Sequence, residues 1–290
     1  MLLLDAVPIT SCHECVATLT LPLALFLILA GTTAGGIATV AYLRVSGGLT
    51  PGFLKFVAVT YAILGVLAFL VVLGAPPGSY HRLLAINQPA ANALVFLQGC
   101  FVLALAVNAV ITWRGNGPST ASSALTLVAS VLVLAAIAAA FWPMAGSALN
   151  GAGITLIVAL SAAVLGAATT GMLLGHWYLV TPALTNRPLL LAIGVLLISL
   201  VLQAVVVPLT LSGVGRGSGS LPHVFGLSPV LSVLWALGAV LLPLVAAGLA
   251  LATCRLRSFM STTGLLYLAM IVILPGQLLG QLLLFVAASA

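Results

Sequence analysis

The sequence predicts an all-α integral membrane protein with eight transmembrane helices. Hydrophobic residues make up 63% of the 290 residues and charged residues 3%, whereas a water-soluble domain has roughly a quarter of its residues charged. The hydrophobic residues form continuous runs of about 20 residues, the length that crosses the hydrocarbon of a bilayer as a helix. Because the runs are continuous, they exclude a β-barrel, whose strands alternate between apolar and polar residues.

The apolar runs place the eight helices in order. They lie at about residues 17–43, 54–74, 90–113, 121–142, 152–180, 189–212, 227–254 and 262–287. Turn-forming residues separate them, at Ser46–Gly48, Ala75–Gly78, Gly115–Pro118, Thr181–Pro182 and Ser212–Ser220. No connection is long enough to form a soluble domain, so residues 1–290 are expected to form a single transmembrane domain. The first 16 residues contain no Lys or Arg, unlike a secretory signal peptide, so we expect them in the mature protein.

Basic residues predict the orientation in the membrane. The connections after the first, third, fifth and seventh helices, with their flanks, carry Arg44, Lys55, Arg114, Arg187, Arg255 and Arg257; the opposite side carries Arg82 and Arg216. The positive-inside rule then places both termini on the outer, periplasmic side. An Ala- and Leu-rich, Lys-poor composition is typical of GC-rich genomes and indicates a bacterial plasma membrane. The cations are spread among loops, so no nucleic-acid partner is expected.

Several residues recur at offsets of 136 and 142 and suggest an internal duplication. Thr33, Gly35 and Tyr42 correspond to Thr169, Gly171 and Tyr178, and His81 corresponds to His223. The halves would be residues 17–142 and 152–287, two parallel four-helix bundles related by an axis along the membrane normal. Apolar sequences also produce such matches by chance, so the sequence leaves the duplication open. Small residues four apart are expected to allow close helix contact, namely Gly31 and Gly35 in the first helix and Gly171 and Gly175 in the fifth.

The near-absence of charge within the spans excludes several functional classes. No carboxylate or Lys lies near the middle of a span, which argues against proton- or cation-coupled transporters and voltage sensors. Enzymes that bind a diphosphate through magnesium need clusters of Asp, and the only Asp in the chain is Asp5.

The first candidate site is the sequence His176-Trp177-Tyr178 at the inner end of the fifth helix. Histidine exchanges protons near neutral pH and ligates haem. One interpretation is a cofactor site, in which the imidazole donates a hydrogen bond to a quinone carbonyl or ligates haem or another pigment. The other is an aromatic belt at the membrane surface with a histidine in the hydrated zone.

The second candidate lies on the predicted outer face. It comprises Cys12, His13 and Cys15, with His81 and His223 in outer loops. The Cys-x-x-Cys spacing favours a structural disulfide between Cys12 and Cys15; a zinc or copper site with these histidines and a redox-active thiol pair are the alternatives. Val16 follows where covalent haem attachment requires His, so that motif is absent.

The remaining polar residues within spans are neutral amides: Asn92, Gln98, Asn108, Gln203, Gln277 and Gln281. Most are expected to connect helices by hydrogen bonds. Gln277 is the strongest candidate to face a cavity, because it follows Pro275-Gly276, where the proline frees a backbone carbonyl.

Three functions follow from these observations. The first is a membrane subunit of an electron-transfer complex that binds quinone or anchors membrane and peripheral redox subunits. In outline, eight spans in two bundles resemble the quinol-interacting anchor subunits of molybdenum enzymes, the family that includes polysulfide reductase and dimethyl sulfoxide reductase anchors; the resemblance is one of architecture and implies a quinone site. The second is a carrier or channel for a neutral or apolar solute, motivated by the possible repeat and by helices expected to break at Pro208, Pro243 and Pro275. The third is an outer-face thiol or metal protein.

Overall fold

The computed structural model describes residues 13–115, 117–145, 147–180, 185–211 and 229–289, and these residues are almost entirely helical. The helices are α1 (His13–Ser46), α2 (Pro51–Gly74), α3 (Gln88–Arg114), α4 (Thr120–Phe141), α5 (Ala148–Val180), α6 (Arg187–Leu211), α8 (Pro229–Trp235), α9 (Leu242–Arg255) and α10 (Phe259–Ser289). The structure also contains two 3₁₀ turns, η1 (Pro77–Tyr80) and η2 (Trp142–Ala145), and one π-helical segment, η3 (Ala236–Leu241). Within the described ranges there is no strand, and eight helical spans are long and apolar enough to cross a membrane. The chain is therefore an all-α, multi-pass membrane protein, as predicted.

Polar residues fix several helix starts. Thr50 accepts a hydrogen bond from the backbone N–H of Phe53, Asn87 from that of Ala90, and Ser119 from that of Ser122. Each bond satisfies one of the amide groups that the first turn of a helix leaves without an intrahelical partner. Pro51 occupies the first turn of α2, where its missing N–H costs nothing.

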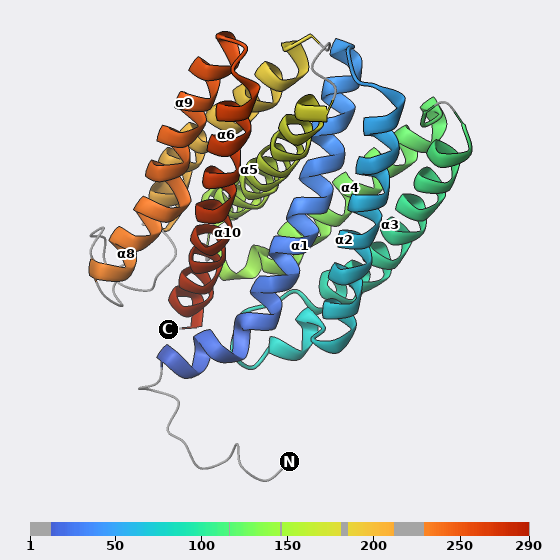
Figure 1. Ribbon diagram of the computed structural model, residues 1–290. Coiled ribbons are helices and arrows are strands. Elements are labelled where there is room, and N and C mark those ends of the chain that lie inside the picture. Colours follow the sequence, from blue (N-terminus) through green and yellow to red (C-terminus); the bar gives the residue numbers. More distant parts are fainter. Residues whose placement is uncertain (1–12, 116, 146, 181–184, 212–228, 290) are drawn as a thin grey trace.

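The helices form one bundle whose two ends differ in charge. The start of α1 and the end of α10 lie at the same end, in the lower part of Figure 1. The opposite end, which we call the basic end, holds the end of α1, the start of α2, the end of α3, the start of α6 and the end of α9. It therefore carries Arg44, Lys55, Arg114, Arg187 and Arg255. Arg216 lies outside the described residues; among those that are described, positive charge gathers at one end of the bundle, as the loops predicted.

Glycine lets α1 and α5 cross at the centre of the bundle. A Cβ atom added to Gly35 would lie closer than 3.0 Å to the carbonyl group of Ala162, and one added to Gly166 would collide with the backbone of Gly35. Beside this crossing, the Tyr61 hydroxyl bonds Thr170 Oγ1 at 2.6 Å, and the Tyr61 ring lies against Gly36. The close contact predicted for Gly35 is confirmed.

The glycines predicted to allow close contact on α5, Gly171 and Gly175, also lie at contacts between helices. Gly171 packs near Ala192 of α6 and Leu266 of α10, and Gly175 packs near Thr263 of α10. Gly171 therefore faces α6 and α10, Gly175 faces α10, and α5 contacts α1 at Ala162 and Gly166. Small residues occur on several faces of α5, so spacing alone does not select the face that meets a given neighbour.

The neighbours of each helix correspond between the two halves of the chain. In the first half α1 packs against α2 and α4, and α3 packs against α2 and α4; in the second half α5 packs against α6 and α10, and α9 packs against α6 and α10. The halves meet mainly through α1 and α5. This correspondence agrees with the predicted duplication, which itself stays a prediction.

The seventh span is not one regular helix. Between α8 and α9 the backbone widens into η3, where the N–H of Leu242 bonds the carbonyl of Leu237, five residues earlier. Pro243 follows in the first turn of α9 and contributes no N–H. The breaks expected at Pro208 and Pro275 do not occur: α6 and α10 continue through these prolines. Each proline removes one hydrogen bond, and the neighbouring turns hold the helix together.

Candidate functional site

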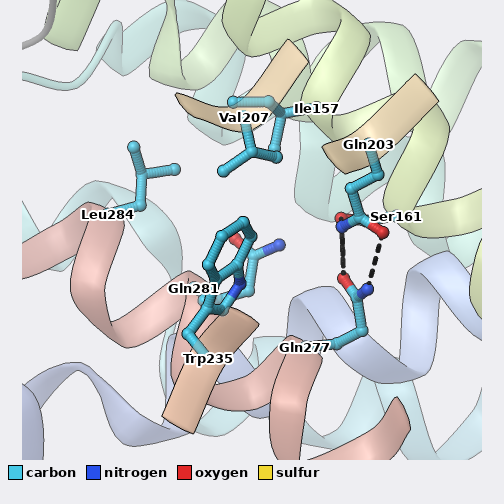
Figure 2. Close-up of a pocket in the computed structure, with 9 residues that line it drawn as sticks. Ile157, Ser161, Gln203, Val207, Trp235, Gln277, Gln281 and Leu284 are labelled. Atoms are coloured by element: carbon cyan, nitrogen blue, oxygen red, sulfur yellow. Dashed lines mark hydrogen bonds between the residues drawn. The ribbon is translucent and has the colours of Figure 1, made fainter. Parts of the chain in front are cut away.

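Three polar side chains from separate helices meet in the interior of the second half. The amides of Gln203 (α6) and Gln277 (α10) bond each other reciprocally: Gln203 Nε2 donates to Gln277 Oε1 at 3.0 Å, and Gln277 Nε2 donates to Gln203 Oε1 at 2.9 Å. Ser161 (α5) donates to Gln277 Oε1 at 3.0 Å. Figure 2 shows the facing amides and the two bonds between them. All three side chains are buried.

A small cavity adjoins this cluster. Its lining residues are Ile157, Ser161, Gln203, Val207, Trp235, Gln277, Gly280, Gln281 and Leu284. Figure 2 draws them and labels all except Gly280. It leaves about 20 Å³ for the centre of a water molecule. A polar cavity needs roughly 10–15 Å³ by this measure to hold one water, so the present shape admits about one water-sized group.

Gln281 gives the cavity its unused hydrogen-bonding capacity. The side chain is 7% exposed and lines the cavity, yet its amide bonds no residue in the described part of the chain. The amides of Gln203 and Gln277 already bond each other. A polar guest would therefore find its first free partner in Gln281, which offers two N–H donors and a carbonyl acceptor.

The contact between α10 and η3 positions these groups. Gly276 packs directly on the backbone of Gly238 and Ala239, where a Cβ atom would collide. One turn further along α10, Gly280 makes room for the indole of Trp235, the last residue of α8. The two glycines thus bring Gln277, Gln281 and Trp235 to the same side of α10.

The cavity suits an uncharged, hydrogen-bonding molecule. Among its lining residues there is no ionisable side chain, and an unpaired ion in such a place would carry a large desolvation penalty. Amides supply both donors and acceptors, while Ile157, Val207 and Leu284 supply apolar surface. Binding and orientation of a small neutral guest are what this arrangement can do chemically.

The sequence identified part of this site. Gln277 was predicted to face a cavity, and it does; Gln203 was expected to connect helices, and it bonds Gln277. Ser161 and Trp235 were missed, because Ser is common at contacts between membrane helices and Trp is common at membrane surfaces. Elsewhere Asn108 accepts from Ser122 Oγ at 3.0 Å, Gln98 donates to the Gly65 carbonyl at 3.4 Å, and Asn92 is exposed.

The predicted His176 cluster points in three directions. His176 is exposed near the end of α5. Trp177 packs against Phe53 and Phe56 of α2, with ring centroids 6.1 and 6.3 Å away. Tyr178 is buried against Phe259, at 5.0 Å, and its hydroxyl donates to the carbonyl of Thr185. The two aromatic residues thus serve contacts between elements, and the quinone or pigment site stays a prediction.

Replacing His176 by Ala tests that prediction. If the imidazole contacts a quinone or ligates a pigment, the variant is expected to lose most of the quinone or visible absorbance that co-purifies with the wild-type protein. The measurement is the absorption spectrum and extracted quinone content of gently purified protein, with Arg187→Gln, also exposed at the basic end, as the control. If His176→Ala keeps the quinone and pigment content of the wild-type protein, only the interpretation as an aromatic belt at the membrane surface remains.

The predicted outer-face metal site lies largely outside the described residues. Cys12 and His223 fall there, and of His13 and Cys15 the structure gives only the backbone at the start of α1. His81 is exposed, and its Nδ1 lies 2.9 Å from the Gly78 carbonyl. Among the residues that are described, no group of three His, Cys, Asp or Glu side chains is placed to hold a metal. The disulfide, metal and thiol alternatives therefore stay predictions.

Comparisons with known proteins gave no match. Neither a protein-family model, nor a curated protein, nor a solved structure matches this chain.

Proposed function

We propose that the protein is a carrier or channel for a small uncharged solute, which binds in the glutamine cavity of the second half. The proposal rests on Gln281, a buried amide that faces the cavity and bonds none of the described residues. A polar solute that enters the cavity can form hydrogen bonds with this amide, which no described residue uses.

The composition of the site supports a neutral solute over an ion. Three glutamines and a serine line it, and no described lining residue is ionisable. A hydroxyl- or amide-bearing molecule can exchange hydrogen bonds with water for bonds with these groups. An ion entering the same place would lose its hydration without a charged partner.

The π-helical segment supports movement at the site. The present cavity admits about one water-sized group, so a larger solute requires the wall to move. η3 lies between two regular helices, α8 and α9, and Trp235 next to it lines the cavity. Irregular backbone within membranes is tolerated where it lines a cavity, and π-helical segments are frequent at functional sites.

Gln281→Leu tests the proposal. Purified protein is reconstituted into liposomes, and the swelling rate after a jump in glycerol or urea is measured by light scattering. Wild-type protein is expected to accelerate swelling for at least one of these solutes, and the variant is expected to lose about tenfold or more, the effect of about 1.4 kcal/mol of lost binding.

Gln98→Leu is the matched control. Gln98 is a buried glutamine of α3 that does not line the cavity. Its Oε1 has no hydrogen-bond partner and its Nε2 makes one long bond of 3.4 Å, so leucine is expected to be tolerated. Swelling of wild-type liposomes no faster than of empty ones, for water, glycerol and urea alike, would contradict the proposed function.

A second proposal is the electron-transfer subunit, with quinone at His176 and membrane or peripheral redox subunits as partners. The exposure of His176 near the end of α5 supports it, because a quinone dissolved in the bilayer reaches such a side chain from the lipid. For both proposals we place the protein in a bacterial plasma membrane with its termini on the periplasmic side. Co-purification with haem- or iron–sulfur-containing subunits would favour the second proposal over the first.

A further inference from the structure

A second polar cavity lies in the first half of the bundle, at its basic end. Residues from α1, α2, α3 and α4 line it, together with Pro118 before α4: Ile37, Val40, Ala41, Arg44, Leu54, Val57, Ala58, Asn108, Thr112, Pro118, Ser123 and Thr126. It leaves about 30 Å³ for the centre of a water molecule, room for about two water-sized groups. It is separate from the glutamine cavity and shares no lining residue with it.

Arg44 brings a positive charge into this cavity. The side chain is partly buried; its guanidinium donates to Ser123 Oγ and, at 3.3 Å, to the carbonyl of Pro118. Both acceptors are neutral. A guanidinium carries five N–H donors in a planar fork, so these two bonds leave several donors for another group.

Neither carboxylate side chain in this sequence pairs with Arg44. The chain contains two, Asp5 and Glu14. Glu14 lies in the first turn of α1 and Arg44 in its last turn, so the helix separates them by about 45 Å. Asp5 precedes α1 by eight residues of sequence, a length that spans at most about 29 Å. Neither carboxylate therefore pairs with Arg44, and its guanidinium is open to an anion from outside the chain.

Asn108 adds a second free donor. It is 7% exposed and lines the cavity; its Oδ1 accepts from Ser122 Oγ, and its Nδ2 donates to none of the described residues. The hydroxyls nearby are already used as donors: Thr112 donates to the Asn108 carbonyl at 2.6 Å, and Thr126 donates to backbone carbonyls of its own helix. The unused donors at this cavity are thus N–H groups of Arg44 and Asn108.

We propose that this cavity takes up one or two oxygens of a phosphate-type anion at the membrane surface, held by Arg44 and Asn108. A phosphate oxygen accepts charge-assisted hydrogen bonds from a guanidinium, and the fork geometry of Arg matches two such oxygens. Basic pockets between membrane helices on the cytoplasmic side take lipid headgroups in the same way. The phosphate belongs either to an anionic phospholipid or to a free anion, and the chemistry of recognition is the same. This inference does not depend on the proposed transport function.

The test compares three forms of the purified, delipidated protein: wild type, Arg44→Gln and Arg114→Gln. Arg114 is exposed, lies at the same end and does not line the cavity, so its replacement removes the same charge without touching the site. Binding of phosphatidylglycerol and of phosphatidylcholine is measured by native mass spectrometry. Wild type is expected to bind phosphatidylglycerol at least tenfold more tightly than phosphatidylcholine; Arg44→Gln loses that preference, and Arg114→Gln keeps it within about twofold.

Inorganic phosphate distinguishes the two sources. If a free anion binds, millimolar phosphate raises the melting temperature of wild type and Arg114→Gln but not of Arg44→Gln, and it competes with phosphatidylglycerol. If only the lipid binds, phosphate has no effect and the preference for phosphatidylglycerol remains. Should Arg44→Gln not fold, Asn108→Ala replaces it and is expected to weaken binding severalfold. The proposal would be overturned if Arg44→Gln and Arg114→Gln lost the preference for phosphatidylglycerol equally, or if the wild-type protein showed no such preference.

Discussion

Replacing Gly35 by Val is expected to abolish stable folding, the largest effect of any substitution considered. The side chain would enter the backbone of α5 at Ala162, which cannot yield as a flexible side chain can. Helices α1 and α5 are the principal contact between the two halves, so separating them disturbs the whole bundle. We expect a loss of at least about 3 kcal/mol, a large part of the usual 5–15 kcal/mol of stability.

Gly166→Val is expected to behave like Gly35→Val, because it collides with the backbone of Gly35 from the other side of the same crossing. Gly194→Ala is the matched control: it lies within α6, and a Cβ atom there meets nothing within 4 Å. The measurements are the yield of monodisperse protein in detergent and its melting temperature. Normal yield and melting temperature for Gly35→Val would show that α1 and α5 do not cross as described.

Gln277→Leu is expected to give the second largest effect. It leaves the amide of Gln203 buried with only a 3.4 Å bond to Ser161 Oγ and removes the acceptor of the Ser161 hydroxyl. Leucine has a similar volume, so the cost comes mainly from the groups left unpaired, about 1–3 kcal/mol. An average hydrogen bond between membrane helices contributes about 0.6 kcal/mol. A larger loss of stability in Gln277→Leu would show that the Gln203–Gln277 pair stabilises the protein more than such an average bond does.

A double-mutant cycle separates a binding role from a purely structural one. Gln203→Leu combined with Gln277→Leu removes both amides, so its destabilisation is expected to be smaller than the sum of the two single effects. Melting temperature and liposome swelling are measured for all four proteins. If the double variant is stable but has lost uptake, the amides serve the solute. Uptake retained by that stable variant would show that the pair only holds α6 to α10.

The identity of the polar residues was readable from the sequence, and their partners were not. Gln277 stood out because proline and glycine precede it in an otherwise apolar helix. Its partner Gln203 is 74 residues away in the chain, and several other amides were equally eligible. In a soluble protein the apolar face of a helix would show which residues turn inward. Here lipid and protein interior are both apolar, so the sequence carries almost no such periodicity.

For Arg44 too, the sequence showed the residue but not its partners. Its position in a connection between spans identified it as a positive charge at one end of the bundle. That it reaches Ser123 and Pro118, and shares a cavity with Asn108, depends on how α1, α3 and α4 pack. The lack of a nearby carboxylate was visible in the sequence, but its meaning required knowing that α1 is one continuous helix from His13 to Ser46.

By itself, the sequence determined that the protein lies in a lipid bilayer, and it determined the number and approximate positions of the membrane spans and the end of the bundle where most basic residues lie. It could do so because burial of apolar residues in lipid depends on composition along the chain. Only the tertiary structure decided which glycines meet, where the seventh span widens into η3, and which amides face a cavity. These depend on the rotation of each helix about its axis, which close packing between helices sets and the average hydrophobicity of a span does not.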